Sequence, residues 1–153
     1  YFLGRSGLTA VTRQLDGRGE KTKLTAMITK EFELKDQTAI INAVYKNNFD
    51  VASVAPLVLK AAEKKDRVCL PIVETSVIHL AEHIGVAAKK ISSSSSKKAK
   101  VRVSFIGGLI SNDTMVSRLL RKHISAKLPG IEIIDPMSSP AYGAVLLGMI
   151  TKH

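Results

Sequence analysis

The sequence predicts an α/β fold in which a long helical segment precedes a β-α-β-α segment. Three observations lead to this prediction. Apolar residues recur at helical spacing through most of residues 1–90. Two short runs rich in Val, Ile and Phe, 101–106 and 131–134, have the composition of strands. A segment of helical length separates these runs, so we expect two parallel strands joined by a right-handed crossover.

Size and composition narrow the class of protein. A chain of 153 residues with 45% hydrophobic residues is large enough for one domain with its own core. Cys69 is the only cysteine, which excludes a disulfide framework and fits a reducing, cytoplasmic setting. No apolar run has the length of a bilayer-spanning helix, so we expect no membrane partner. Because the chain does not begin with Met, we expect a fragment or a processed product.

The net charge of +10 indicates a partner that carries phosphate, either a nucleotide or a nucleic acid. The chain has no Trp, three Tyr and four Phe, so it offers few platforms on which bases could stack. A nucleic-acid partner is therefore not expected. A basic nucleic-acid-binding module nevertheless stays open as an alternative function.

The helices of the first segment are delimited by capping residues. The first helix is expected from Phe2 to Gln14, and the second from Thr22 or Lys23. Three aspartates are good N-caps for later helices: Asp36 for 37–46, Asp50 for 51–64 and Asp66 for 67–90. Residues 91–100, a serine run followed by lysines, are expected to form a mobile loop.

Asp16-Gly17-Arg18-Gly19 separates the first two helices, because glycines flank a single residue. As structure, this segment is a turn. As function, it could place Asp16 or Arg18 beside a ligand. The sequence leaves both interpretations open.

The strand at 101–106 leads directly into Gly107-Gly108. Two glycines after a strand allow positive φ and let the backbone lie against a ligand. A helix is expected from Thr114 to Leu128, with Met115, Leu119, His123 and Ile124 on one face. Another is expected from 141 to 152, after Ser139-Pro140. Strand, glycine turn and helix together are typical of α/β proteins that bind a phosphate or nucleoside, although a plain tight turn explains the pair as well.

Six segments occur in an order that resembles the C-terminal domain of the BadF/BadG/BcrA/BcrD ATPase family, which includes the N-acetylglucosamine kinases. They are Tyr1-Phe2-Leu3-Gly4-Arg5, Asp16-Gly17-Arg18-Gly19, Thr22-Lys23-Leu24-Thr25, Ala61-Ala62-Glu63-Lys64-Lys65-Asp66, Ile106-Gly107-Gly108 and Ser139-Pro140-Ala141-Tyr142-Gly143-Ala144. The resemblance covers nearly the whole chain. It implies the ribonuclease H-like fold of actin and the sugar kinases, with residues 1–153 as a single C-terminal lobe that contains a helical insertion and an incomplete sheet.

The resemblance also implies a nucleotide site. Gly107 and Gly108 match the adenosine motif, and Asn112 matches a position close to the adenine. Lys65 and Asp66 match a turn that lies near the nucleotide in relatives. Relatives commonly have glycine where this chain has Lys65, so the role of that turn is open. The cofactors implied are ATP and Mg²⁺.

The parts of the family's active site that perform chemistry have no match in this chain. The first phosphate loop, the catalytic aspartate and the acid associated with Mg²⁺ lie on the N-terminal domain of relatives. The second phosphate loop and the sugar-binding turn precede the position of Tyr1. We therefore expect no catalytic residue and no metal ligand here, and no kinase activity from this chain alone.

Four functions are consistent with the sequence. The first is the adenosine-binding lobe of an amino sugar kinase, which the helical insertion of relatives would assemble into a homodimer. The second is a BadF-type ATPase activator, whose cluster would need more cysteines than Cys69. The third is the basic nucleic-acid-binding module, and the fourth is an inactive scaffold with the same fold.

Overall fold

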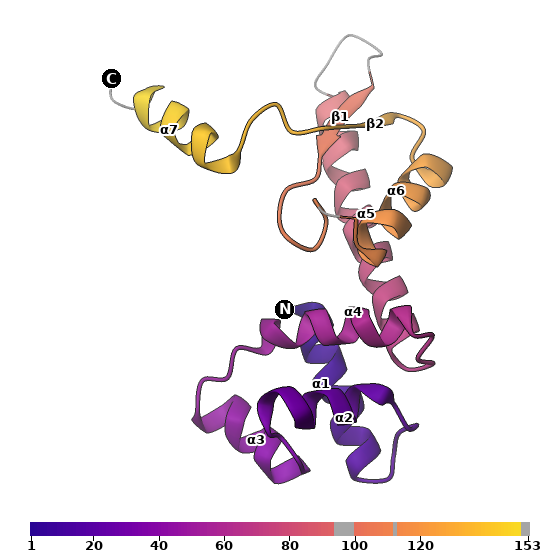
Figure 1. Ribbon diagram of the computed structural model, residues 1–153. Helices are drawn as coiled ribbons and strands as arrows, with labels where there is room; N and C mark the ends of the chain where they lie inside the picture. Colours follow the sequence, from indigo (N-terminus) through magenta and orange to yellow (C-terminus); the bar gives the residue numbers. More distant parts are fainter. Residues whose placement is uncertain (94–99, 112, 151–153) are drawn as a thin grey trace. The chain divides into compact units, whose positions relative to one another are not determined.

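The computed structural model describes residues 1–93, 100–111 and 113–150, and these residues form two compact units, Tyr1–His79 and Leu80–His153. The first unit is helical. The second contains a small parallel sheet with helices before and after each strand (Figure 1). The predicted class, helices followed by β-α-β-α, is confirmed at this level. The prediction of a single lobe stays a prediction.

The first unit is built from helices α1 to α4 and the start of α5. Their bounds are α1 Phe2–Leu15, α2 Lys23–Phe32, α3 Gln37–Lys46, a 3₁₀ turn Val51–Val54, α4 Ala55–Glu63 and α5 Cys69–Ser93. The capping predictions hold, because Thr22, Asp36 and Asp50 each accept a hydrogen bond from the first turn that follows them. The segment after Asp50 is not one helix as expected. It starts as a 3₁₀ turn and becomes α4 at Ala55, with Pro56 in the first turn.

The core of the first unit lies around α1, which contacts α2, α3, α4 and the 3₁₀ turn. Its interior is made of fully buried apolar side chains: Val11, Leu24, Ile28, Val54, Val58 and Val73. Gly4 allows α1 to lie close to the backbone of the 3₁₀ turn, because a Cβ at this position would overlap the carbonyl oxygen of Val51. The glycine in the first of the six family segments therefore has a packing role.

The second unit contains the end of α5, strands β1 Val101–Ser104 and β2 Ile131–Ile134, and helices α6 Met115–Lys127 and α7 Pro140–Ile150. The strands are parallel, with Val101 opposite Ile131 and Ser104 opposite Ile134. This confirms the predicted parallel pairing. Among the described residues, β1 and β2 make up the whole sheet.

Helix α6 begins at a capping box, in which Thr114 and Ser117 each bond the other's backbone N–H. The expected face is confirmed at Ile124 and is one position off at Met115 and Leu119. The buried side chains are Val116, Ser117, Leu120 and Ile124, whereas Met115 and Leu119 are only half-buried.

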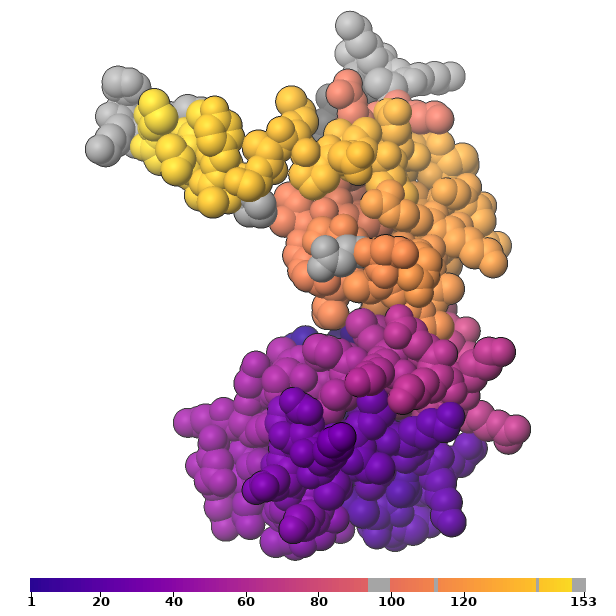
Figure 2. Space-filling view, in the orientation of Figure 1, coloured from indigo at the N-terminus to yellow at the C-terminus, as the bar shows by residue number. Residues whose placement is uncertain are grey.

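Helix α7 is apolar on all sides, and its large side chains are exposed. Tyr142, Val145, Leu147 and Met149 all have more than half of their surface open to solvent. In Figure 2 the yellow atoms of α7 are visible along the helix. None of the helices in residues 1–93, 100–111 and 113–150 combines the length and hydrophobicity needed to cross a bilayer.

The mobile loop is expected at 91–100, but its first three residues are helical, because α5 continues to Ser93. Residues 94–99 lie outside the described residues.

Candidate functional site

The turn after β1 carries the two predicted nucleotide-binding glycines on an exposed backbone. Gly107 has φ +114°, a conformation that L side chains rarely adopt, so this position needs glycine for its own backbone. The carbonyl oxygen of Gly107 accepts hydrogen bonds from the N–H groups of Ile110 and Ser111, at 3.0 and 2.9 Å, and from the Ser111 hydroxyl at 2.7 Å. These three bonds fix the turn.

Gly108 differs from its neighbour in an informative way. Its φ does not lie in the left-handed region, and no atom of the described residues lies within 4 Å of the position that a Cβ would take. Neither backbone strain nor packing within the described chain therefore requires glycine at this position. A ligand that lies against the backbone would be one reason for glycine here, since a Cβ would occupy the ligand's space. Gly130 shares both features, so they do not by themselves mark a ligand site.

The end of the turn is held to the start of α6. The hydroxyl of Thr114 donates to the carbonyl of Leu109 at 2.5 Å, and the same oxygen accepts from the Ser117 N–H of the first helical turn. The geometry from Gly107 to α6 is thus set by local bonds. Asn112, the third predicted nucleotide contact, lies outside the described residues.

Asp66 caps the start of α5, as predicted, and it has a second structural role that the sequence did not reveal. Its side chain is buried, and its two carboxylate oxygens accept four hydrogen bonds. Those from the Thr22 hydroxyl and the Lys23 N–H, at 2.9 and 2.7 Å, come from the start of α2. Those from Val68 and Cys69 come from the start of α5. One carboxylate therefore caps the starts of two helices. Thr22, at the start of α2, is 44 residues away from Asp66 in the sequence.

These bonds decide the charge of Asp66. Burial raises the pKa of the carboxyl, but the hydrogen bonds from Lys23, Cys69, Thr22 and Val68 together lower it below its ordinary value. The group is therefore ionised at neutral pH, and its oxygens are occupied within the chain. This arrangement suits a helix cap better than a nucleotide contact. No local sequence signal marks the bonds to α2, because the other described helices also lack an acidic residue in their first turns.

Lys65 occupies a position that favours glycine. Its φ is +56°, in the left-handed region, and its N–H donates to the carbonyl of Ala62 while that of Asp66 donates to Ala61. This is the Schellman arrangement that ends α4. The departure from the glycine of relatives thus affects a helix end, and the exposed side chain of Lys65 leaves the hydrogen-bonded backbone of the turn intact.

Cys69 is buried under this cap. Burial raises the pKa of its thiol to about 12, and the sulfur lies 3.7 Å from the Thr22 hydroxyl. A buried neutral thiol is a poor ligand for an exposed iron–sulfur cluster, because the thiolate is the form that binds metal. Among the described residues, no group of three or more His, Cys, Asp or Glu side chains could hold a metal ion.

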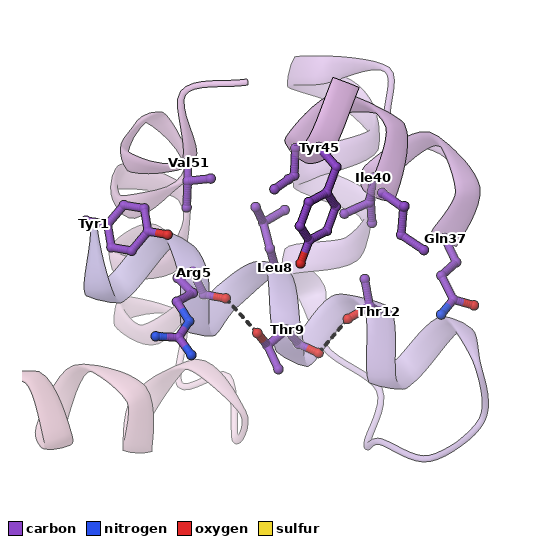
Figure 3. A pocket seen from close by; sticks show the side chains of 11 residues that line it. Tyr1, Arg5, Leu8, Thr9, Thr12, Gln37, Ile40, Tyr45 and Val51 are labelled. Atoms are coloured by element: carbon purple, nitrogen blue, oxygen red, sulfur yellow. Dashed lines mark hydrogen bonds between the residues drawn. The ribbon is translucent and has the colours of Figure 1, made fainter. Parts of the chain in front are cut away.

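The first unit also has an open groove between α1 and α3, with a volume of about 490 Å³ (Figure 3). Its lining includes apolar Leu8, Ile40 and Val51, and Tyr1 and Tyr45, both exposed. Thr9 and Thr12 donate their hydroxyl hydrogens to the carbonyls of Arg5 and Thr9, so both donors are already used along α1. This groove was not predicted from the sequence.

A second hollow in this unit is lined by three arginines, Arg13, Arg18 and Arg67. One signal for it is present in the sequence, namely the turn of residues 16–19, whose functional interpretation places Arg18 beside a ligand. Arg67 carries no such signal, because its approach to that turn depends on the tertiary fold.

Comparison with known proteins places this sequence in a family. The sequence profile of the BadF/BadG/BcrA/BcrD ATPase family matches residues 1–148. An N-acetylmuramic acid/N-acetylglucosamine kinase of Clostridium acetobutylicum is 27% identical over 150 residues, which are 96% of this chain and 48% of the relative. An N-acetyl-D-glucosamine kinase of Dictyostelium discoideum is 27% identical over 156 residues, 99% of this chain and 48% of the relative. The chain spans about half the length of these curated relatives. The resemblance expected from the six segments is confirmed, and the chain belongs to the BadF/BadG/BcrA/BcrD ATPase family.

Proposed function

We propose that this chain is the adenosine-binding, C-terminal lobe of an ATP-dependent amino sugar kinase. The family match and the two relatives named as N-acetylglucosamine kinases support the kinase assignment. The fold of the complete protein would then be ribonuclease H-like, with further strands beside β1 and β2. We expect the protein to work in the cytoplasm, where its donor ATP is available.

One observation carries the proposed nucleotide site, namely that the exposed pair Gly107-Gly108 follows β1, at the carboxyl end of a parallel strand. The exposed backbone of Gly107 and Gly108 would lie against the adenosine, and Asn112 would lie near the base. When bound, ATP supplies the phosphoryl group for the C6 hydroxyl of an N-acetylated amino sugar. This lobe would hold and orient the nucleotide. Positioning of the nucleotide is a large part of how proteins catalyse phosphoryl transfer.

The nucleotide site is tested by NMR. Titration of the ¹⁵N-labelled chain with ATP is expected to shift the amide signals of Gly107 and Gly108 in a saturable way. Signals of the α1–α3 groove, such as that of Gln37, serve as the internal control and should stay in place. Saturable shifts that omit the two glycines would contradict the site.

Catalysis is expected to need the rest of the protein. The chain alone, with ATP, Mg²⁺ and N-acetylglucosamine, should form no sugar phosphate, because the phosphate loops and the catalytic aspartate of relatives have no match here. Sugar phosphate formed by the purified chain would refute the assignment as a lobe without catalytic residues.

The second function within the family, a BadF-type ATPase activator, is less well supported. Its iron–sulfur cluster would need cysteine ligands, and Cys69 is buried with a raised thiol pKa. Iron analysis of the full-length protein separates the two functions, since the kinase requires no iron.

We further propose a homodimer. The exposed apolar surface of α7 supports association with another chain. Light scattering of the full-length protein is expected to give twice the mass of one chain, and a monomer at high concentration would count against the dimer.

A further inference from the structure

The hollow beside the turn of residues 16–19 has the chemistry of an anion site. It has a volume of about 360 Å³, and three arginines line it. They come from α1, from the turn, and from the residue after Asp66: Arg13, Arg18 and Arg67. Ala10, Val68 and Pro71 add apolar wall. A volume in this range accommodates a small organic ligand.

The turn that presents Arg18 is held in place at both ends. Gly17 has φ +81°, and the Gly19 N–H donates to the carbonyl of Arg13 at 2.7 Å. A Cβ at Gly19 would lie 2.9 Å from the Cβ of Arg13, so glycine is needed for this close approach. Beyond the turn, the Gln14 amide oxygen accepts from the Thr22 N–H at 2.7 Å. The backbone that carries Arg18 is therefore fixed beside that of Arg13.

Arg67 is positioned by the second anchor, the Asp66 cap. Asp66 is buried and bonds both flanking helix starts, so the backbone of the next residue is fixed as well. Two hydrogen-bond networks, which meet at Thr22, thus bring three arginines from separate segments to one hollow. Preorganised donors of this kind reduce the ordering cost of binding.

The charge balance favours an anion. Three positive charges stand against two negative ones, those of Asp16 behind Arg18 and of Glu20 in the lining. Asp16 bonds Nε and one terminal nitrogen of Arg18, which is one edge of the guanidinium. A guanidinium has five N–H donors in one plane, so its other edge can serve a second oxyanion.

We propose that this hollow binds the phosphoryl group of a phosphate monoester. Guanidinium groups match phosphate oxygens in geometry, and three of them around one hollow suit a dianion with three terminal oxygens better than a single carboxylate. The backbone N–H groups of Arg18, Gly19 and Val68 already donate within the chain, so the guanidiniums supply the donors. The apolar wall would contact the organic part of the ester. The nucleotide site proposed above does not use these residues, and this inference does not rest on it.

The test is a titration of the full chain with inorganic phosphate and, separately, with glycerol 3-phosphate, followed by NMR at constant ionic strength. Both probes are expected to shift the amide signals of Arg18 and Gly19. Tighter binding of glycerol 3-phosphate identifies a monoester as the ligand, and equal binding identifies free phosphate. Both results support a phosphate site. The absence of saturable shifts at millimolar concentrations of either probe would overturn it.

Variants separate a built site from general attraction to a basic protein. Arg67→Gln and Arg13→Gln are each expected to weaken binding at least about tenfold, since each removes a charge-assisted hydrogen bond. Arg5→Gln is the matched control, because it removes the same charge from the exposed surface of α1 outside this hollow. Equal weakening by Arg5→Gln and Arg67→Gln would overturn the site. All three positions are exposed, and unchanged thermal unfolding confirms that each variant folds.

Discussion

The two units of the chain differ in how completely they cover their apolar residues. In Tyr1–His79, helices cover one another, and Val11, Leu24 and Ile28 have no exposed surface. In the second unit, α7 has the most apolar sequence of the helices but leaves Val145, Leu147 and Met149 open to solvent. Burial of apolar surface is the main driving force of folding, so the first unit is stabilised by contacts among its own helices. The second unit has surface that another element or chain would cover.

The largest expected effect comes from the covered core. Ile28→Ala removes a fully buried side chain between helices and is expected to destabilise the first unit by about 2–5 kcal/mol. Met149→Ala, the matched change on α7, should alter stability by less than about 0.5 kcal/mol, because Met149 is 67% exposed. Urea unfolding measures both. Similar losses in the two variants would show that α7 is covered, contrary to this comparison.

The next effect concerns the two kinds of helix cap. Asp66→Ala leaves the starts of α2 and α5 without their buried acceptor and should cost about 3 kcal/mol. Asp36→Ala, the control, removes an exposed cap that accepts one bond from the Ala39 N–H at 2.7 Å, at a cost of about 1 kcal/mol. Equal losses would mean that Asp66 caps only one helix.

The same carboxylate predicts a dependence on pH. Since its folded-state pKa is lowered, its contribution is fully present above the unfolded pKa, about 3.9, and is lost as the pH falls through the lower folded-state value. Unfolding of the wild type should therefore become easier below about pH 4. Asp66→Asn should be less stable at pH 7 and should lose less on acidification. A parallel pH profile for the two proteins would rule out this role.

The smallest effect has the opposite sign. Lys65 has φ +56°, so Lys65→Gly should relieve left-handed strain and stabilise the protein by about 1 kcal/mol. Lys64→Gly is the control, because Lys64 has φ −83° and gains nothing from glycine. Stabilisation by both changes, or by neither, would contradict the assignment of the left-handed position to Lys65. Thermal unfolding measures the difference.

Local signals explain what could be predicted from the sequence. Thr22, Asp36, Asp50 and Thr114 act on backbone groups two or three residues away, so each is recognisable as an N-cap or a helix start. The two strands are recognisable by their β-branched residues, and their parallel pairing follows from the length of the crossover between them.

Tertiary relations explain what could not be predicted. Asp66 is recognisable as a cap of α5, but its bonds to Thr22 and Lys23 depend on how α2 packs. The expected face of α6 is right at Ile124 and one position off at Met115, because Val116 is also apolar and the neighbouring elements decide which side chain is covered. For the site, the sequence singles out the glycine pair, but only the structure distinguishes Gly107, which its φ explains, from Gly108.

The central claim, that the turn after β1 binds ATP, is tested most directly by Gly108→Val beside Gly130→Val. Both glycines lack a left-handed φ, and at neither position would a Cβ have a described atom within 4 Å, so both variants should unfold at the wild-type temperature. Isothermal titration with ATP should show affinity reduced at least about tenfold by Gly108→Val and unchanged by Gly130→Val. Wild-type affinity in Gly108→Val would contradict the claim.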